Sequence, residues 1–284
     1  MKKRIILDTD IGGDIDDAYA LALALNSKEI IIEAIITNDT HAMERAKLAS
    51  ILVNSVGHKI PIFEGLNVGK GRLIETKLIE NDSFKPLKLK DHLPFFKKLF
   101  NSEISYVSIG SLSNIAFFLD KIPYLEDKAH FLIMGGSIGV DYNGKPSVVA
   151  EWNIRNNINA SKKVFTSKLD ITLVSLDSTW DLKLSKQDIE RINTVKRPIN
   201  SILSHMLTSL RAFLKKEFYP VLHDPLTISL VFNKSFVQFK TCKLIINSEG
   251  KIIEDQKFGK EVKVAINSDK RAFIDFFLER ICVI

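Results

Sequence analysis

The sequence contains little cysteine and no long apolar run. Its two cysteines, Cys242 and Cys282, are too few for a disulfide framework and lack the spacing of a metal site. No stretch approaches the roughly 18 apolar residues of a membrane span. The N-terminus lacks the apolar core and the small-residue cleavage site of a signal peptide. These absences exclude a disulfide-stapled or membrane-spanning protein. They predict a cytoplasmic location and no membrane partner.

The sequence also lacks a strong charge imbalance. It carries 40 Lys and Arg against 34 Asp and Glu, which gives a net charge of +6. Aromatic residues are not interleaved with the basic ones in any pattern typical of nucleic-acid binding. We interpret the excess as a solvated basic surface that attracts anionic ligands only weakly, and we expect no nucleic-acid partner.

Short apolar runs alternate with amphipathic stretches over about the first 180 residues. Such alternation is typical of βαβ units and a mostly parallel sheet, with helices on both faces because the crossovers are right-handed. The predicted strands cover residues 4–10, 30–37, 60–63, 105–110, 130–135 and 171–177. The predicted helices cover about 14–25, 42–55, 93–100, 113–119 and 160–166.

After residue 177 the pattern becomes helical and then returns to strands. Helices are predicted at 186–193, 199–218, from about 225, and at 270–280; strands are predicted at 235–247 and 262–267, with a hairpin turn at 247–251. Residues 65–91 are polar, lysine-rich and poorly periodic, so we expect a loop at one end of the sheet. No linker or repeat is visible. We therefore predict one α/β domain over residues 1–284, with an open, mostly parallel, Rossmann-related sheet.

Five carboxylates lie within ten residues at the end of the first predicted strand. The segment reads Asp8-Thr9-Asp10-Ile11-Gly12-Gly13-Asp14-Ile15-Asp16-Asp17. In open α/β sheets, ligands bind beyond the carboxyl ends of the strands. Like charges about 4 Å apart repel by roughly 4 kcal/mol at an effective dielectric of 20. The turn therefore needs a compensating charge, and a hard cation such as Ca²⁺ or Mg²⁺ suits oxygen ligands.

A purely structural interpretation accounts for part of this cluster. Asp14 could cap the following helix, with Asp17 as its capping-box partner, and Asp16 could favour the positive helix end. This alternative does not explain Asp8 and Asp10, which lie at the end of an apolar strand. We therefore favour a metal or catalytic role for the cluster.

Six separated motifs, in order, carry a resemblance to a known family. They are the aspartate segment at 8–21, Gly110-Ser111-Leu112-Ser113-Asn114-Ile115-Ala116, Met134-Gly135-Gly136, Ala150-Glu151-Trp152-Asn153, Leu176-Asp177-Ser178-Thr179 and His223-Asp224-Pro225-Leu226. Together the motifs extend over about residues 4–230 and resemble those of the inosine-uridine-preferring nucleoside hydrolase family. The fold implied is nucleoside-hydrolase-like.

The resemblance implies hydrolysis of the N-glycosidic bond of a ribonucleoside, giving ribose and a free base. By position, a single Ca²⁺ would be bound by Asp10, Asp17, Asp224 and the backbone carbonyl of Ile109. The ion would lower the pKa of a bound water, and Asp10 would accept its proton. His223 matches a histidine near the nucleobase, where it would assist the leaving group.

The resemblance also assigns substrate contacts. Asp16, Glu151 and Asn153 match positions that hydrogen-bond the ribose hydroxyls, and Asp39 stands where the family has an Asn or Asp after its second strand. The negative field of these carboxylates would stabilise an oxocarbenium-like transition state. Family members suggest a homodimer or homotetramer.

Several departures from the family pattern keep other functions open. The aspartate segment is two residues longer than the short form of the signature, so Asp14 is supernumerary, and residues 65–91 lack the usual His-Gly-rich loop. Base specificity is therefore not predicted, and a member that binds a ribosyl compound without turnover, or acts on a different one, is an alternative. A second alternative is a haloacid-dehalogenase-like phosphatase, in which Asp8 would be the nucleophile.

Overall fold

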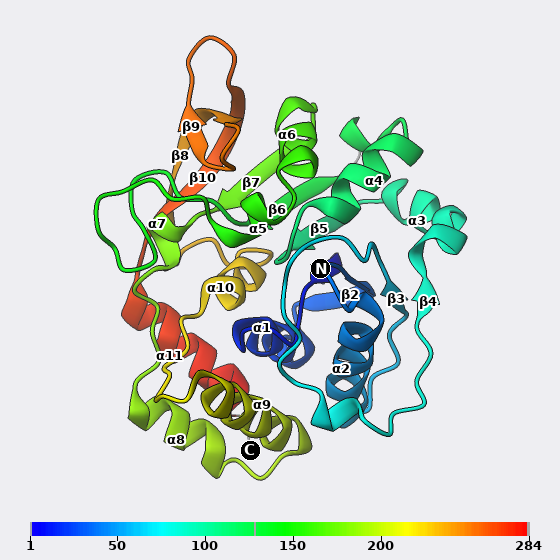
Figure 1. Ribbon diagram of the computed structural model, residues 1–284, viewed down its shortest axis with the longest axis vertical. Coiled ribbons are helices and arrows are strands. Elements are labelled where there is room, and N and C mark those ends of the chain that lie inside the picture. Colours follow the sequence, from blue (N-terminus) through cyan, green and yellow to red (C-terminus); the bar gives the residue numbers. More distant parts are fainter. Residues whose placement is uncertain (1, 128, 283–284) are drawn as a thin grey trace.

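Ten strands form one continuous sheet in the computed structural model, which describes residues 2–127 and 129–282 (Figure 1). The strands are β1 (Lys3–Thr9), β2 (Ile30–Thr37), β3 (Ile62–Glu64), β4 (Leu87–Lys88), β5 (Ser105–Ser108), β6 (His130–Met134), β7 (Asp170–Val174), β8 (Val237–Ile246), β9 (Ile252–Glu254) and β10 (Lys260–Ser268). Their order is β4-β3-β2-β1-β5-β6-β7-β10-β8-β9.

The sheet is parallel except at one end. Strand β1 pairs in parallel with β2 and β5, so that Leu7 lies between Ile35 and Val107 at its centre. Strands β8 and β9 run antiparallel to their neighbours and close one edge. The predicted open, mostly parallel α/β sheet is confirmed. The hairpin turn at 247–251 is confirmed as well, with Gly250 at a φ of 79°.

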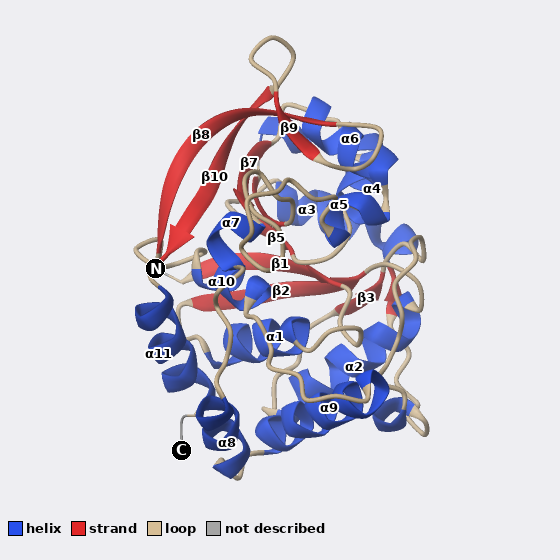
Figure 2. Cartoon of the chain, turned by 60° about the vertical axis from the view of Figure 1, so that its left-hand side comes forward, coloured by secondary structure: helices blue, strands red, loops and turns tan. Residues whose placement is uncertain are grey.

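Helices cover both faces of the sheet (Figure 2). They are α1 (Asp16–Asn26), α2 (Ala42–Ser55), α3 (Leu93–Phe100), α4 (Ser113–Lys121), α5 (Trp152–Asn156), α6 (Ile158–Thr166), α7 (Leu176–Thr179), α8 (Lys186–Thr194), α9 (Pro198–Leu214), α10 (His223–Ser229) and α11 (Lys270–Ile281). One apolar core lies between the sheet and α1, α2, α9, α10 and α11, and a second lies beneath α3, α4 and α6. None of the helices in the described part of the chain is long and apolar enough to span a membrane.

The differences from the predicted elements lie in short pieces and at the ends of helices and strands; the strand predicted at 171–177, for example, ends at Val174, before α7. Strands β4 and β9 and helices α5 and α7 were not predicted, because two to five residues are too few to establish a period. Helix α9 stops at Leu214, four residues before the predicted end, where Lys215 takes a left-handed φ of 52°. Residues 65–91 are mostly loop, as expected, although they include β4, one short 3₁₀ turn at Lys77–Ile79 and most of a second at Leu89–His92.

Candidate active site

A cavity of about 650 Å³ lies beyond the carboxyl ends of the central strands, a size typical of small-molecule sites. Its lining is strongly acidic on one side: Asp10, Asp14, Asp16, Asp17, Glu151 and Asp224. The same cavity is lined by Ile109, Asn153 and His223. All but one of the predicted site residues therefore surround a single space, although they are spread over more than two hundred residues of sequence.

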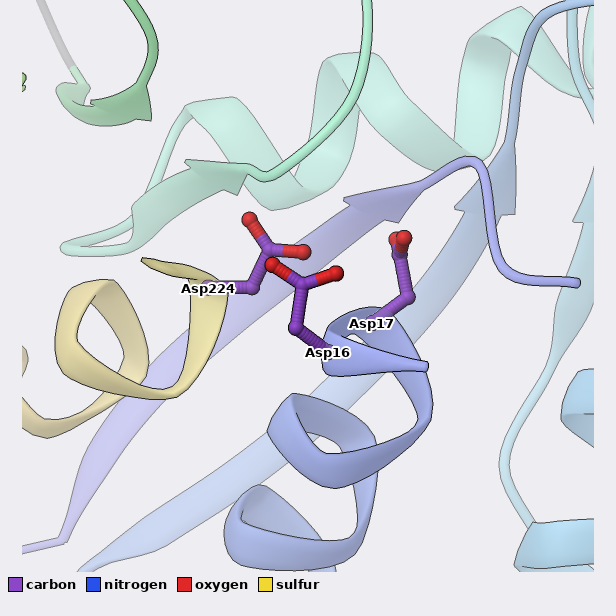
Figure 3. A group of neighbouring side chains, drawn as sticks. All are labelled: Asp16, Asp17 and Asp224. Carbon is purple, nitrogen blue, oxygen red and sulfur yellow. The ribbon is translucent and has the colours of Figure 1, made fainter. Parts of the chain in front are cut away.

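Three carboxylates from the first turns of α1 and α10 point toward one another (Figure 3). Asp16, Asp17 and Asp224 are buried, and each offers an oxygen within 4.8 Å of the others. Burial, strengthened by repulsion from neighbouring carboxylates, raises the pKa of all three well above the usual range. The sequence prediction placed Asp10 rather than Asp16 beside Asp17 and Asp224. The structure brings Asp16 into the group because it directly precedes Asp17 on α1.

Asp10 lies in the turn that follows β1 and faces the same cavity. Burial raises the pKa of Asp10 to about 6, against the opposing effect of the Arg45 guanidinium. The charge on Asp10 in turn raises the pKa values of Asp16, Asp17 and Asp224. The four carboxylates therefore behave as one electrostatic unit.

The capping part of the structural interpretation is wrong, although Asp16 does lie in the first turn of α1, at the positive helix end. Helix α1 begins at Asp16, and its N-cap residue is Ile15, which makes no side-chain cap hydrogen bond. Asp17 instead accepts a hydrogen bond of 2.5 Å from the Thr9 hydroxyl at the end of β1. Asp14 only accepts from the adjacent Ile15 backbone N–H. The cluster is therefore not explained by the needs of the helix end.

Glu151 and Asn153 form a firm wall of the cavity at the start of α5. The Glu151 carboxylate caps this helix and accepts from the backbone N–H groups of Asn153 and Ile154, and from that of Gly136 at 2.8 Å. Burial raises the pKa of Glu151. The Asn153 amide donates to the carbonyl of Ile109 at 3.3 Å. The carbonyl predicted to bind the metal is thus held in place at the cavity wall.

His223 lines the same cavity from the start of α10. Burial lowers the pKa of His223 to about 4, so its ring is neutral near pH 7. Its Nδ1 lies 2.7 Å from the Thr179 hydroxyl. The ring of Tyr142 packs edge-on against it, with centroids 6.3 Å apart. Asp177, which accepts from the backbone N–H groups of residues 138 and 139, anchors the hairpin that carries Tyr142.

Asp39 is the predicted site residue that does not line this cavity. It is fully buried and lies behind the cavity wall, where its Oδ2 is 3.8 Å from Nη2 of Arg45. Its Oδ1 accepts from the backbone N–H of Gly71 at 3.0 Å. Arg45 itself is 1% exposed and donates to the carbonyls of Asp10 and Ile11. Asp39 is therefore one residue removed from the cavity and acts on it through Arg45 and Gly71.

The position of Asp8 contradicts the phosphatase alternative. This carboxylate is fully buried beneath the site and accepts hydrogen bonds from Asn38 at 2.7 Å, Asn114 at 3.0 Å and Tyr106 at 2.6 Å. Burial raises its pKa to about 7. A side chain enclosed by three donors cannot act as the nucleophile on a bound phosphate ester, so Asp8 is part of the support for the β1 end.

Four cationic side chains and one tyrosine also line the cavity and were not predicted from the sequence. They are Arg45, Lys70, Arg72, Tyr142 and Arg155. Of these five, only Lys70 and Arg72 stand in a recognisable sequence pattern, because they alternate with glycines in Gly69-Lys70-Gly71-Arg72. Tyr142 and Arg155 stand on a hairpin and on a five-residue helix that the sequence did not predict. Arg45 stands on the predicted helix α2, but nothing in the sequence indicates that it reaches the cavity.

The inosine-uridine preferring nucleoside hydrolase family matches this chain over residues 5–275. The pyrimidine-specific ribonucleoside hydrolase RihA of Salmonella schwarzengrund (strain CVM19633) is 27% identical over 308 residues, covering 98% of this chain and 97% of the relative. RihA of Enterobacter sp. (strain 638) is 26% identical with the same coverage.

Solved structures agree in fold. A plant nucleoside hydrolase, PpNRh1, superposes with a TM-score of 0.80 at 24% identity over 100% of both chains. A purine-preferring ribonucleoside hydrolase from Gardnerella vaginalis gives a TM-score of 0.79 at 22% identity, covering 99% of this chain and 98% of that one. With a family match across nearly the whole chain, and with its site residues gathered around one acidic cavity, the protein belongs to the inosine-uridine preferring nucleoside hydrolase family and is an enzyme.

Proposed function

We propose that the protein hydrolyses the N-glycosidic bond of a ribonucleoside in a Ca²⁺-dependent reaction that releases ribose and a free base. The observation that carries the proposal is the group of Asp16, Asp17 and Asp224, with Asp10 beside it, on the floor of a cavity that has His223 on its wall. The relatives named above support ribonucleosides as the substrate class. They differ in base preference, so no base is assigned.

The donor set fits a hard cation. Several buried carboxylates of raised pKa, together with a backbone carbonyl, form an oxygen-only site that is electrostatically unfavourable without a positive charge. We assign Asp10, Asp17, Asp224 and the Ile109 carbonyl as the protein ligands. When bound, Ca²⁺ would hold two ribose hydroxyls and make a water easier to deprotonate. Asp16 is assigned to accept hydrogen bonds from those hydroxyls.

Asp10 is proposed as the general base. Burial raises the pKa of Asp10 to about 6 without the ion, and a bound Ca²⁺ would oppose this rise and keep the carboxylate ionised near pH 7, ready to accept a proton. The proton leaves the attacking water for the Asp10 carboxylate as the oxygen bonds to the anomeric carbon, while the C–N bond breaks and its electron pair leaves with the base. The field of Asp10, Asp16 and Asp17 would stabilise the positive charge that develops on the sugar.

His223 is proposed to assist the leaving base as a neutral ring. The Thr179 hydroxyl oxygen lies 2.7 Å from Nδ1 of His223 and 3.3 Å from the carbonyl oxygen of Ser175. We assign the hydroxyl hydrogen to the shorter contact, so that Thr179 donates to Nδ1. Nε2 of His223 then carries the ring hydrogen and donates to the departing base. The low pKa of His223 argues for a hydrogen bond to the base rather than complete proton transfer.

The remaining predicted residues are assigned to holding the sugar. Glu151 and Asn153 are proposed to contact ribose hydroxyls through the side-chain atoms that face the cavity. Asp39 is proposed to contribute indirectly, by holding Arg45 and Gly71. A homodimer or homotetramer, and a cytoplasmic setting, stay predictions.

A panel of ribonucleosides tests the proposal. Ribose release would be followed with a reducing-sugar assay, with Ca²⁺ and after chelation. We expect release that chelation abolishes and Ca²⁺ restores. Nucleoside binding without ribose release would instead identify a binding protein and contradict the hydrolase assignment. Release that is unaffected by chelation would contradict the metal assignment.

A further inference from the structure

The cavity has two electrostatic halves. Its floor carries the carboxylates described above. The exposed charged residues of its lining are Asp14 and three cations, Lys70, Arg72 and Arg155. We call these three side chains the cationic rim. Within residues 2–127 and 129–282, none of the three forms an ion pair with a carboxylate. The rim thus presents positive charge that no protein side chain neutralises.

The loop that carries Lys70 and Arg72 is fixed by contacts to buried groups. The backbone N–H of Gly71 donates to Oδ1 of Asp39 at 3.0 Å, and its carbonyl accepts from the Thr40 hydroxyl. The carbonyl of Arg72 accepts from the Arg45 guanidinium at 3.4 Å. These contacts hold the backbone on both sides of Gly71, so the two cationic side chains start from defined positions at the cavity.

The glycines of this loop allow that close approach. A Cβ added to Gly71 would lie 1.8 Å from Oδ2 of Asp39, and one added to Gly69 would lie 2.0 Å from Oδ1 of the same carboxylate. Any side chain at either position would therefore push the loop away from Asp39. The alternation of glycine with a cationic residue in Gly69-Lys70-Gly71-Arg72 has a geometric explanation: the glycines face the buried anchor and the cations line the cavity.

The third cation is tied to the same loop. Arg155 lies on α5, two residues after Asn153, and its guanidinium stacks over the Trp152 ring with its carbon 5.1 Å from the ring centroid. The next residue, Asn156, accepts from the backbone N–H of Lys70 at 2.8 Å. The loop and α5 are therefore joined directly. The rim is one structure next to the residues that we assign to the ribose hydroxyls.

We propose that the cationic rim binds a phosphate carried by the ribosyl part of the substrate, so that the preferred substrate is a ribonucleoside 5′-monophosphate or a related phosphoribosyl compound. The position of the phosphate on the ribose rests on the function proposed above. A neutral nucleoside would leave three cations without partners, whereas a phosphate monoester offers oxygens that accept from both Lys and Arg. The acidic floor disfavours an anion at the reacting end, which leaves the rim as its place in the cavity.

Binding measured without turnover tests this inference. Titration calorimetry would compare ribose 5-phosphate with ribose, and inorganic phosphate alone, on the full chain in the presence of Ca²⁺. We expect ribose 5-phosphate to bind at least about tenfold more tightly than ribose, as charge-assisted hydrogen bonds would give. We expect this preference to weaken as salt is raised. Equal binding of the two sugars would overturn the proposal.

Variants assign the preference to the rim. The double variant Lys70→Gln with Arg72→Gln, and the single variant Arg155→Gln, should lose most of the preference while binding ribose as before. The control variants Lys77→Gln and Arg191→Gln change exposed cations outside the cavity and should keep the preference for ribose 5-phosphate. A phosphate preference that survives in the rim variants would arise elsewhere and would overturn the proposal.

Kinetics separate this inference from the proposed hydrolase function. Uridine 5′-monophosphate should have a higher kcat/KM than uridine, through a lower KM. If neither is hydrolysed but ribose 5-phosphate still binds preferentially through the rim, the hydrolase assignment fails and the rim assignment stands. A preference for orotidine, whose carboxylate is on the base, over both uridine and its monophosphate would overturn the phosphoribosyl assignment.

Discussion

The floor and the rim of the cavity are built in different ways. The floor residues Asp10, Asp17 and Asp224 stand at the end of β1 and at the starts of α1 and α10, where regular elements determine the backbone. Two of the three rim residues, Lys70 and Arg72, stand on a loop whose position depends on single hydrogen bonds to Asp39, Arg45 and Asn156, whereas Arg155 stands on the short helix α5. One half of the site is thus determined by the fold, and the other by local contacts.

This difference separates chemistry from specificity. In the proposed function the floor would contact only the cation and the ribose, which all ribosyl substrates share. The rim would contact the part that distinguishes one ribosyl compound from another. A family member can therefore keep its reaction and change its substrate by replacing a loop, which is a common division between a scaffold and its loops.

Removing the proposed general base, Asp10, from the floor should cause the largest loss of activity. Asp10→Ala deletes both the proposed proton acceptor and one proposed metal ligand, so kcat/KM for a ribonucleoside should fall by about 10⁴-fold. Steady-state kinetics at saturating Ca²⁺ would measure the loss, and calcium titration would show weaker binding. Asp275→Asn, an exposed change on α11, serves as the control and should have the wild-type rate. A wild-type rate for Asp10→Ala would remove the base assignment.

The carboxylates of the floor, together with Asp8 beneath them, should also make the free energy of unfolding depend on pH and on Ca²⁺. Burial raises the pKa of Asp8 to about 7 and that of Asp10 to about 6, against 3.8 for the free group. The folded protein therefore binds more protons than the unfolded chain between about pH 4 and pH 7, and the associated stability is lost as pH rises through that window. For Asp8 alone the loss is about 4 kcal/mol.

Thermal unfolding would measure this dependence. In chelator, the melting temperature should be lower at pH 8 than at pH 5, by on the order of 10 °C. Added Ca²⁺ should raise the melting temperature more at pH 8, where the floor is ionised, than at pH 5. A Ca²⁺ effect of equal size at both pH values would show that the carboxylates of the floor are not the binding site.

The same division explains what could be predicted from the sequence. The floor was predictable because Asp10 follows a buried apolar strand and the resemblance linked it to Asp224, far away in sequence. Which carboxylates lie closest together was less predictable, because Asp16 joins Asp17 and Asp224 through the geometry of one helical turn. Asp39 could not be placed, since nothing in its segment indicates that it faces Arg45 and Gly71 rather than the cavity.

The rim could not be predicted for a physical reason. Residues 65–91 have no hydrophobic period, so neither the path of the loop nor its contact with Asn156 follows from pattern. Its glycines suggested only a turn, and the need for them becomes evident only from the distance to Asp39. Tyr142 likewise reaches His223 on a hairpin held by Asp177, a contact between segments that carry no shared signal.

A change at His223 should have an intermediate effect that depends on the leaving group. His223→Ala removes the proposed hydrogen bond to the departing base, so kcat on uridine should fall by about 10²-fold. An activated nitrophenyl riboside, which needs no such assistance, should lose only a few-fold. Comparing kcat for the two substrates in wild type and variant measures the difference. Equal losses on both would exclude a leaving-group role for His223 and leave it as a residue that shapes the cavity.

The smallest effect on activity should come from a substitution that moves the loop carrying Lys70 and Arg72 without changing its charge. Gly71→Ala places a Cβ against the buried Asp39 carboxylate, so the loop must shift, at a cost of about 1–3 kcal/mol in unfolding free energy. On a phosphorylated substrate, KM should rise about tenfold or less and kcat should fall by a smaller factor, because the new Cβ meets Asp39 and Arg45 rather than the floor carboxylates themselves. Gly57→Ala is the matched control: Gly57 has a φ of 73° and open space around it, so alanine there costs about 1 kcal/mol of backbone strain and moves nothing in the cavity. If Gly57→Ala raised KM as much as Gly71→Ala does, the effect would reflect lost stability, and the rim would lose its claim to an independent role in substrate binding.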